Sequence, residues 1–273
     1  MNHSKKARYR LYLLLSIIVS IIGVGLLYIF NTSLIIKAFR DYDDALQVIL
    51  IISIRILILG LTSYYLFHKW LKQEAQYLSD IPFLLGLFFL VLVFGKVIDL
   101  FWDLTFFTFN DTLVLFFLKF RFFIIIFGVA PLIYLGLEIV FFRLEDRFNR
   151  LKDNKFMNKL RFTIILLIVF SESFIVIIAP NNTVMGLILP CIVIPSLIGI
   201  VYIFFLAYRL KRLSVVKPGI LTIGFFLYLI SNIFRPLMQN ILGEKASYII
   251  ITELVDIIIF LVIFIGLYRK NKL

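Results

Sequence analysis

The sequence predicts an all-α, polytopic membrane protein: a bundle of about eight transmembrane helices. The chain of 273 residues is 62% hydrophobic and only 16% charged, with a mean hydropathy of +1.06, whereas about a quarter of the residues of a soluble domain are charged. Apolar runs of about 20 residues, the length that crosses a bilayer, recur from Leu11 to the C-terminus. No polar stretch between them is long enough to fold alone. We therefore expect one transmembrane domain over residues 1–273, surrounded by the lipid bilayer.

The apolar runs place the spans at about 11–31, 45–68, 81–106, 113–142, 161–179, 184–208, 218–240 and 247–268. The first run follows four basic residues, as in a signal peptide, but it is too long for one and no cleavage pattern follows, so we expect a retained anchor helix. Spans one to four and five to eight would be parallel halves, whose third and fourth members carry charges at similar depth. This arrangement favours a 4+4 parallel pseudo-repeat, although the halves share no residue-level similarity.

The orientation follows from the 28 basic residues. Twenty flank the spans on the side of both termini, three lie on the other side, and five lie within spans. The positive-inside rule then places both termini in the cytoplasm, and we expect the protein in the cell membrane. Because the basic residues flank apolar runs, the net charge of +12 does not indicate nucleic acid binding.

The chain lacks the motifs of most enzymes. It has two histidines, one cysteine (Cys191), and no zinc-protease, hydrolase, P-loop or dinucleotide-binding pattern. We therefore expect no cofactor, no metal and no enzymatic activity. An acid/base enzyme acting on lipid is the least favoured alternative, because no nucleophile motif is present.

The predicted site consists of charged and polar residues inside apolar runs, where each charge near a helix centre costs about 2.5–3.5 kcal/mol. With a rise of about 1.5 Å per residue, five cations and five anions fall in the outer half of the bilayer. The predicted ligand- or ion-binding residues are Arg55, Lys96, Asp99, Asp103, Arg121, Glu172, Asn232, Arg235, Glu253 and Asp256. Lys119, the fifth cation at this depth, is expected to point outward to the headgroups, and Glu138, which lies outside the layer, is expected to reach Arg143 or the cytoplasmic interface.

Depth predicts the pairing of these charges. We expect Arg235 to pair with Asp99 or Asp103, and Arg121 with Glu253 or Asp256. The alternative is that the charges are plain ion pairs that fix the register of the helices. Ten such groups in one layer are more than register requires, which favours a pocket.

Two functions fit such a pocket. The first is a transporter of a small solute or ion, because arginines suit an anionic group and carboxylates a cationic group, so a small polar or zwitterionic solute satisfies both. The alternative is a ligand-sensing, receptor-like module that signals through the basic loop Arg143–Arg161 to a cytoplasmic protein partner. Leu144, Phe148 and Leu151 in this loop recur at helical spacing, so we expect either an amphipathic segment at an anionic leaflet or a solvated loop.

Overall fold

The fold is helical, as the sequence predicts. The structure, a computed structural model, describes residues 3–41, 44–105, 111–145, 147–211, 213, 215–243 and 246–269. It is 89% helix, with no strand in the described part of the chain. Within these ranges, eight helices are long and apolar enough to cross a membrane. The prediction of a polytopic helical bundle is confirmed.

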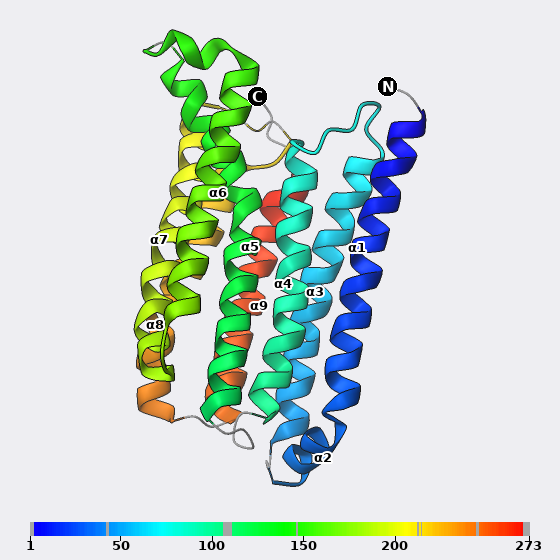
Figure 1. Cartoon of the computed structure of the whole chain (residues 1–273), viewed down its shortest axis with the longest axis vertical. Coiled ribbons are helices and arrows are strands. Elements are labelled where there is room, and N and C mark those ends of the chain that lie inside the picture. Colours follow the sequence, from blue (N-terminus) through cyan, green and yellow to red (C-terminus); the bar gives the residue numbers. More distant parts are fainter. Residues whose placement is uncertain are drawn as a thin grey trace.

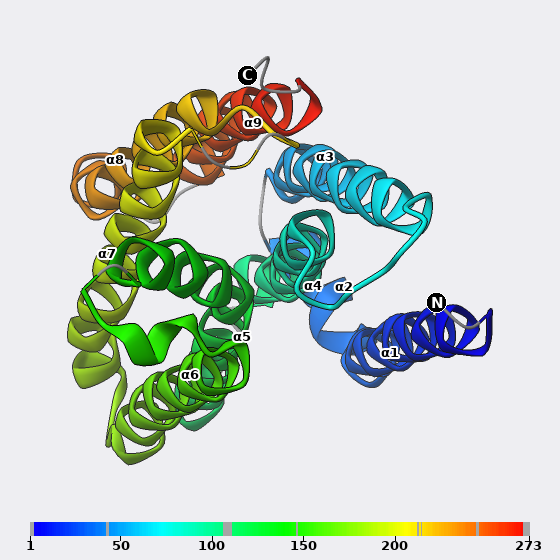
Figure 2. The same ribbon diagram turned by 90° about the horizontal axis from the view of Figure 1, so that it is seen from above.

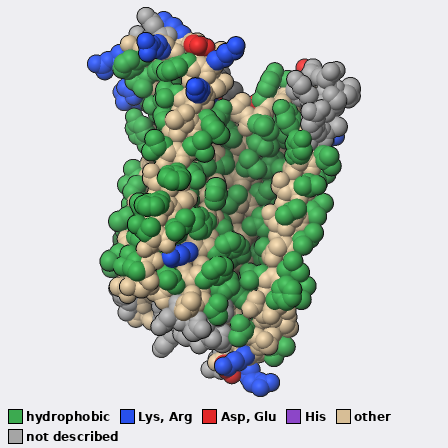
Figure 3. All heavy atoms as spheres, viewed as in Figure 1, with side chains coloured by type: hydrophobic (Ala, Val, Ile, Leu, Met, Phe, Trp, Pro, Cys, Tyr) green, Lys and Arg blue, Asp and Glu red, His purple; other side chains and the backbone are tan. Residues whose placement is uncertain are grey.

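The eight long helices run alternately up and down (Figure 1). They are α1 His3–Phe30, α3 Ala45–Leu71, α4 Ile81–Thr105, α5 Asp111–Leu144, α6 Asn154–Ile178, α7 Asn182–Arg209, α8 Pro218–Leu242 and α9 Ala246–Tyr268. Both termini lie at one end of the bundle, here called the terminal end; the other is the opposite end. Hydrophobic side chains cover the flank of the bundle between the two ends, and most basic side chains in this view gather at the terminal end (Figure 3).

Six helices form a closed ring in which each packs on the next, in the order α3, α4, α5, α7, α8, α9 and back to α3 (Figure 2). Outside the ring, α1 packs on α4 and α6 packs on α5. The contacts α3–α4–α5 in the first half match α7–α8–α9 in the second, and α3–α9 matches α5–α7. This order is compatible with a 4+4 parallel pseudo-repeat for the six ring helices.

The terminal half of the ring is filled by apolar side chains from all six helices. At its centre is an aromatic cluster, defined here as Phe88, Phe89, Phe204, Phe225 and Phe260, all at most 3% exposed. The rings of Phe204 and Phe225 stack with centroids 5.2 Å apart. In a lipid environment such packing holds helices together by van der Waals contact, since lipid tails are as apolar as the side chains.

Two glycines permit close helix approaches in this half. A Cβ on Gly224 of α8 would lie 2.5 Å from Cγ1 of Ile263 on α9, and one on Gly136 of α5 would lie 2.1 Å from Cδ1 of Ile203 on α7. Small residues at such contacts are typical of membrane helix interfaces.

The structure contains a helix where the sequence predicts only a connection. Helix α2, Thr32–Asp41, lies between the first two spans at the opposite end. It is amphipathic: Ala38 is buried against Ala45 and Leu104, while Lys37 is exposed. The short apolar edge was missed because it is far shorter than a membrane span.

The connection between α5 and α6 also differs from the prediction. Helix α6 begins at Asn154 rather than at 161, because the Asp153 side chain caps it by accepting a hydrogen bond of 2.9 Å from the backbone N–H of Lys155. Leu151 is buried in the short 3₁₀ helix η2, Asn149–Lys152, while Phe148 beside it is exposed. One continuous helix that carries Leu144, Phe148 and Leu151 on one face is therefore not formed in the described residues, and Asp146 lies outside them. Contact of this loop with an anionic leaflet stays a prediction.

Candidate functional site

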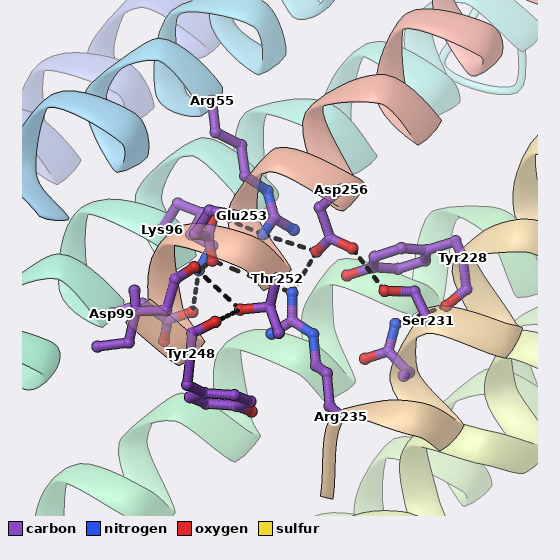
Figure 4. Close-up of polar contacts among 12 residues, drawn as sticks. Arg55, Lys96, Asp99, Tyr228, Ser231, Arg235, Tyr248, Thr252, Glu253 and Asp256 are labelled. Atoms are coloured by element: carbon purple, nitrogen blue, oxygen red, sulfur yellow. Dashed lines mark hydrogen bonds and ion pairs between the residues drawn. The ribbon is translucent and has the colours of Figure 1, made fainter. Parts of the chain in front are cut away.

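Seven charged side chains from five ring helices meet inside the bundle, and Figure 4 labels all of them except Arg121. This set, called the charged layer below, comprises Arg55 of α3, Lys96 and Asp99 of α4, Arg121 of α5, Arg235 of α8, and Glu253 and Asp256 of α9. Each lies about 9–15 Å along its helix from the opposite end, at 1.5 Å per residue. The charges therefore share one depth, as predicted, on the opposite-end side of the aromatic cluster.

The two carboxylates of α9 form the centre of the layer. Glu253 and Asp256 are one helical turn apart, so both face the same side, and both are buried. The Arg55 guanidinium bridges them, with Nη1 at 2.8 Å from Glu253 and 2.7 Å from Asp256. Asp256 also accepts hydrogen bonds from Arg235 and from the hydroxyl of Ser231, the latter at 2.9 Å. Figure 4 shows Arg55 and Arg235 approaching these carboxylates from opposite sides.

Helices α4 and α5 extend the layer. The Lys96 ammonium lies 2.6 Å from Glu253 and 3.4 Å from Asp99. Asp99 in turn contacts Nε of Arg121 at 2.6 Å, and the Arg121 guanidinium lies over the Trp102 ring, 5.7 Å from its centroid. The ion pairs therefore form one connected chain from α8 through α9 and α4 to α5.

The predicted pairing is wrong, although the predicted depth is right. Arg235 pairs with Asp256, and at 4.0 Å with Glu253, instead of Asp99 or Asp103. Arg121 pairs with Asp99 instead of Glu253 or Asp256. Each arginine reaches the carboxylate of its neighbour in the ring, since α8 packs on α9 and α5 packs on α4. Depth alone does not reveal this order.

Four side chains of the layer are buried and three are partly exposed. At most 8% of the side-chain surface of Arg55, Lys96, Glu253 and Asp256 is exposed. In contrast, 31% of Arg121, 26% of Arg235 and 20% of Asp99 are exposed. The three partly exposed side chains come from α5, α8 and α4, whereas the four buried ones come from α3, α4 and α9.

The layer also contacts the aromatic cluster, which lies next to it toward the terminal end. The Arg55 guanidinium lies over the Phe260 ring, 5.1 Å from its centroid. Phe260 in turn packs edge-on against Phe89, with centroids 6.2 Å apart. A shift of Arg55 would therefore reach the apolar packing of the terminal half directly.

Three of the predicted site residues are not ion-paired within the layer. Asp103, one turn beyond Asp99 and half-buried, has no ion pair within 4 Å among the described residues. Asn232 donates to the backbone oxygen of Tyr228 on its own helix at 2.8 Å. Glu172 of α6 lies outside the ring and is not brought to the layer.

The two charges expected elsewhere are also outside the layer. Lys119 donates to the backbone oxygen of Ile177 at 2.8 Å, near the C-terminus of α6, so it points away from Arg121 as predicted but caps a helix end. Glu138 pairs with buried Arg161 at 2.8 Å instead of with Arg143, because α6 packs on α5 and begins before Arg161.

Some contributors were not predicted from the sequence. Ser231, Trp102 and Phe260 contact the charged groups, and Tyr28 of α1 donates to the backbone oxygen of Val97 at 2.7 Å, beside the layer. Serine and aromatic residues are common in such helices, so only the three-dimensional arrangement distinguishes these from the others. In the described ranges, no group of three or more His, Cys, Asp or Glu is placed to hold a metal ion.

Comparison with known proteins adds no relative: no family model matches the chain, and no curated protein or solved structure shows significant similarity to it.

Proposed function

We propose that this multi-pass membrane protein transports a small polar solute through the ring of six helices, with the charged layer as the binding site. The observation that carries this proposal is the partial exposure of the layer next to a tightly filled terminal half. Arg121, Arg235 and Asp99 are accessible, while the terminal half of the ring is filled by the aromatic cluster. A polar binding site next to tightly packed apolar side chains that close one half of the ring is the arrangement of a carrier that is open toward one side of the membrane and closed toward the other.

The charges also supply a means of coupling binding to opening. A solute that binds Arg121 and Arg235 competes with Asp99 and Asp256 for them, which weakens the ion pairs that join α4 to α5 and α8 to α9. Arg55 connects the same carboxylates to Phe260 of the aromatic cluster. Rearrangement of the charged layer therefore loosens the packing of the aromatic cluster directly, because Arg55 contacts both.

Solute uptake into proteoliposomes tests the proposal. Purified protein is reconstituted, incubated with an equimolar mixture of amino acids, short monocarboxylates and alkylamines, and the lumen is analysed by mass spectrometry. We expect one class to enter faster than in protein-free liposomes, and Arg121→Gln to abolish this uptake. Lys119→Gln, which alters a basic residue on the same helix that faces away from the layer, is the matched control and should transport normally. Binding without uptake of any class would reject transport in favour of a sensor.

A further inference from the structure

We propose that the solute is a zwitterion, with its anionic group bound by Arg121 and Arg235 and its cationic group bound by Asp103. This inference rests on the proposed function, because it identifies the solute of the same site. Its basis is the set of charged groups in and beside the layer that lack a partner among the described residues.

The guanidinium of Arg121 has two terminal nitrogens that are available to donate hydrogen bonds. Its Nε is held by Asp99 at 2.6 Å and its face by Trp102, so the guanidinium is fixed in position. Its two terminal amino groups have no hydrogen-bond partner among the described residues, and 31% of the side chain is exposed. A fixed guanidinium with two free terminal amino groups suits a carboxylate, which accepts two parallel hydrogen bonds.

Arg235 is also incompletely used. One of its terminal amino groups binds Asp256, whereas its Nε is buried and has no hydrogen-bond partner in the described part of the chain. The Arg235 side chain remains 26% exposed, so it is accessible to a solute, as Arg121 is. In Figure 4 the Arg235 side chain approaches the layer from the side opposite to Arg55.

Asp103 is the matching anion. It interacts electrostatically with Lys96 and Arg121, and also with Tyr248, yet it forms no ion pair within the described residues. Its place on α4 is one turn nearer the opposite end than Asp99. It therefore lies on the same face of α4 as Asp99, the residue that holds Arg121, and it is left free to bind a cationic group beside that arginine.

Charge balance favours a zwitterion over a simple ion. The layer holds four cations, Arg55, Lys96, Arg121 and Arg235, and three anions, Asp99, Glu253 and Asp256. Asp103 brings the ionised total to zero. A solute with no net charge keeps that balance, while a lone anion or cation would leave an uncompensated charge in a low-dielectric site. The arrangement accordingly assigns a solute that carries both charges.

Binding of ω-amino acids tests the assignment and measures the charge separation. The protein in lipid nanodiscs is titrated calorimetrically with glycine, β-alanine, 4-aminobutyrate and 6-aminohexanoate, and with the carboxylate and the alkylamine of equal length. We expect one ω-amino acid to bind at least tenfold more tightly than either matched ion, since each charged hydrogen bond contributes about tenfold to hundredfold in affinity. Asp103→Asn should remove this advantage, and Arg121→Gln should weaken the amino acid and the carboxylate alike.

Two further variants complete the test. Asp103→Glu keeps the charge but extends it by one methylene, so the preferred amino acid should become shorter. Glu172→Gln removes a carboxylate outside the ring and should change nothing. The inference is overturned if the carboxylate or the amine alone binds as tightly as the amino acid, if the advantage persists in Asp103→Asn, or if no compound binds. Uptake of a simple ion that depends on Arg121 would reject the zwitterionic solute and keep the transport function. Binding of a zwitterion without its uptake would keep the zwitterionic ligand and reject the transport function.

Discussion

Replacing Asp256 by asparagine should destabilise the protein strongly, and the loss should be recovered in part by a second change at Arg55. The Asp256 carboxylate is fully buried, forms an ion pair with Arg55 at 2.7 Å, and accepts hydrogen bonds from Arg235 and Ser231. Breaking a buried pair on one side typically costs about 3–5 kcal/mol. We expect about 3 kcal/mol for Asp256→Asn, because Arg55 keeps Glu253 at 2.8 Å and Arg235 is partly exposed.

The double variant Arg55→Met/Asp256→Asn removes both members of the pair. Residues in direct contact couple by about 0.5–3 kcal/mol, so the double variant should be less destabilised than the sum of the single variants by at least 1 kcal/mol on that scale. The free energies of unfolding can be measured by titrating SDS into mixed micelles and following helix content by circular dichroism, with each variant measured in the same lipid and detergent.

A control cycle separates contact from net charge. Arg121→Met changes the total charge as Arg55→Met does, but Arg121 pairs with Asp99 and not with Asp256. The cycle of Arg121 with Asp256 should therefore couple by less than about 0.5 kcal/mol. Equal coupling in the two cycles would mean that total charge matters and the individual contacts do not. Absence of coupling in both would mean that water screens the layer, and the described pairing would be refuted.

Three other outcomes are expected. Arg161→Gln should lower the free energy of unfolding by about 1–3 kcal/mol, because the buried guanidinium also packs on an aromatic ring; in the same SDS titration the exposed Lys159→Gln should change little, and equal effects would refute a structural role. Gly224→Val should disrupt the α8–α9 contact, where a Cβ would already lie 2.5 Å from the facing isoleucine, and gel filtration should show aggregation or loss of the folded peak. In a variant without the native cysteine, an impermeant thiol reagent applied to cells should label a cysteine at Asn181 but not one at Asn154; labelling of the latter would reject the predicted orientation.

Composition and periodicity were sufficient to predict the helices of the bundle. The length of each apolar run defines where a span lies. The predicted and observed bounds agree where a clear start signal, such as Pro218, begins a helix. They fail where a single polar side chain decides the boundary: Asp153 starts α6 earlier than hydropathy suggests. Helix α2 was missed for a related reason, since its buried edge depends on a partner surface that only the folded bundle supplies.

The site was predictable in depth but not in pairing. Position along a helix follows from the rise per residue, so all seven residues of the charged layer could be assigned to one level. Which carboxylate meets which guanidinium depends on the order of helices in the ring, and hydropathy contains no information on that order. Glu172 illustrates the limit: its depth matches the layer, yet α6 lies outside the ring.

The ring order also shows that the two contacts between the halves are chemically different. At the contact of α3 with α9, Arg55 bridges Glu253 and Asp256. At the corresponding contact of α5 with α7, Gly136 packs on Ile203 and the residues of the shared cluster are apolar. Ion pairs respond to the charge of a bound solute, whereas apolar packing does not. A solute in the charged layer would therefore act on one contact and leave the other intact. If the protein transports as proposed, the α5–α7 contact would be the fixed point about which the halves move, and the α3–α9 contact would be the one that a solute changes.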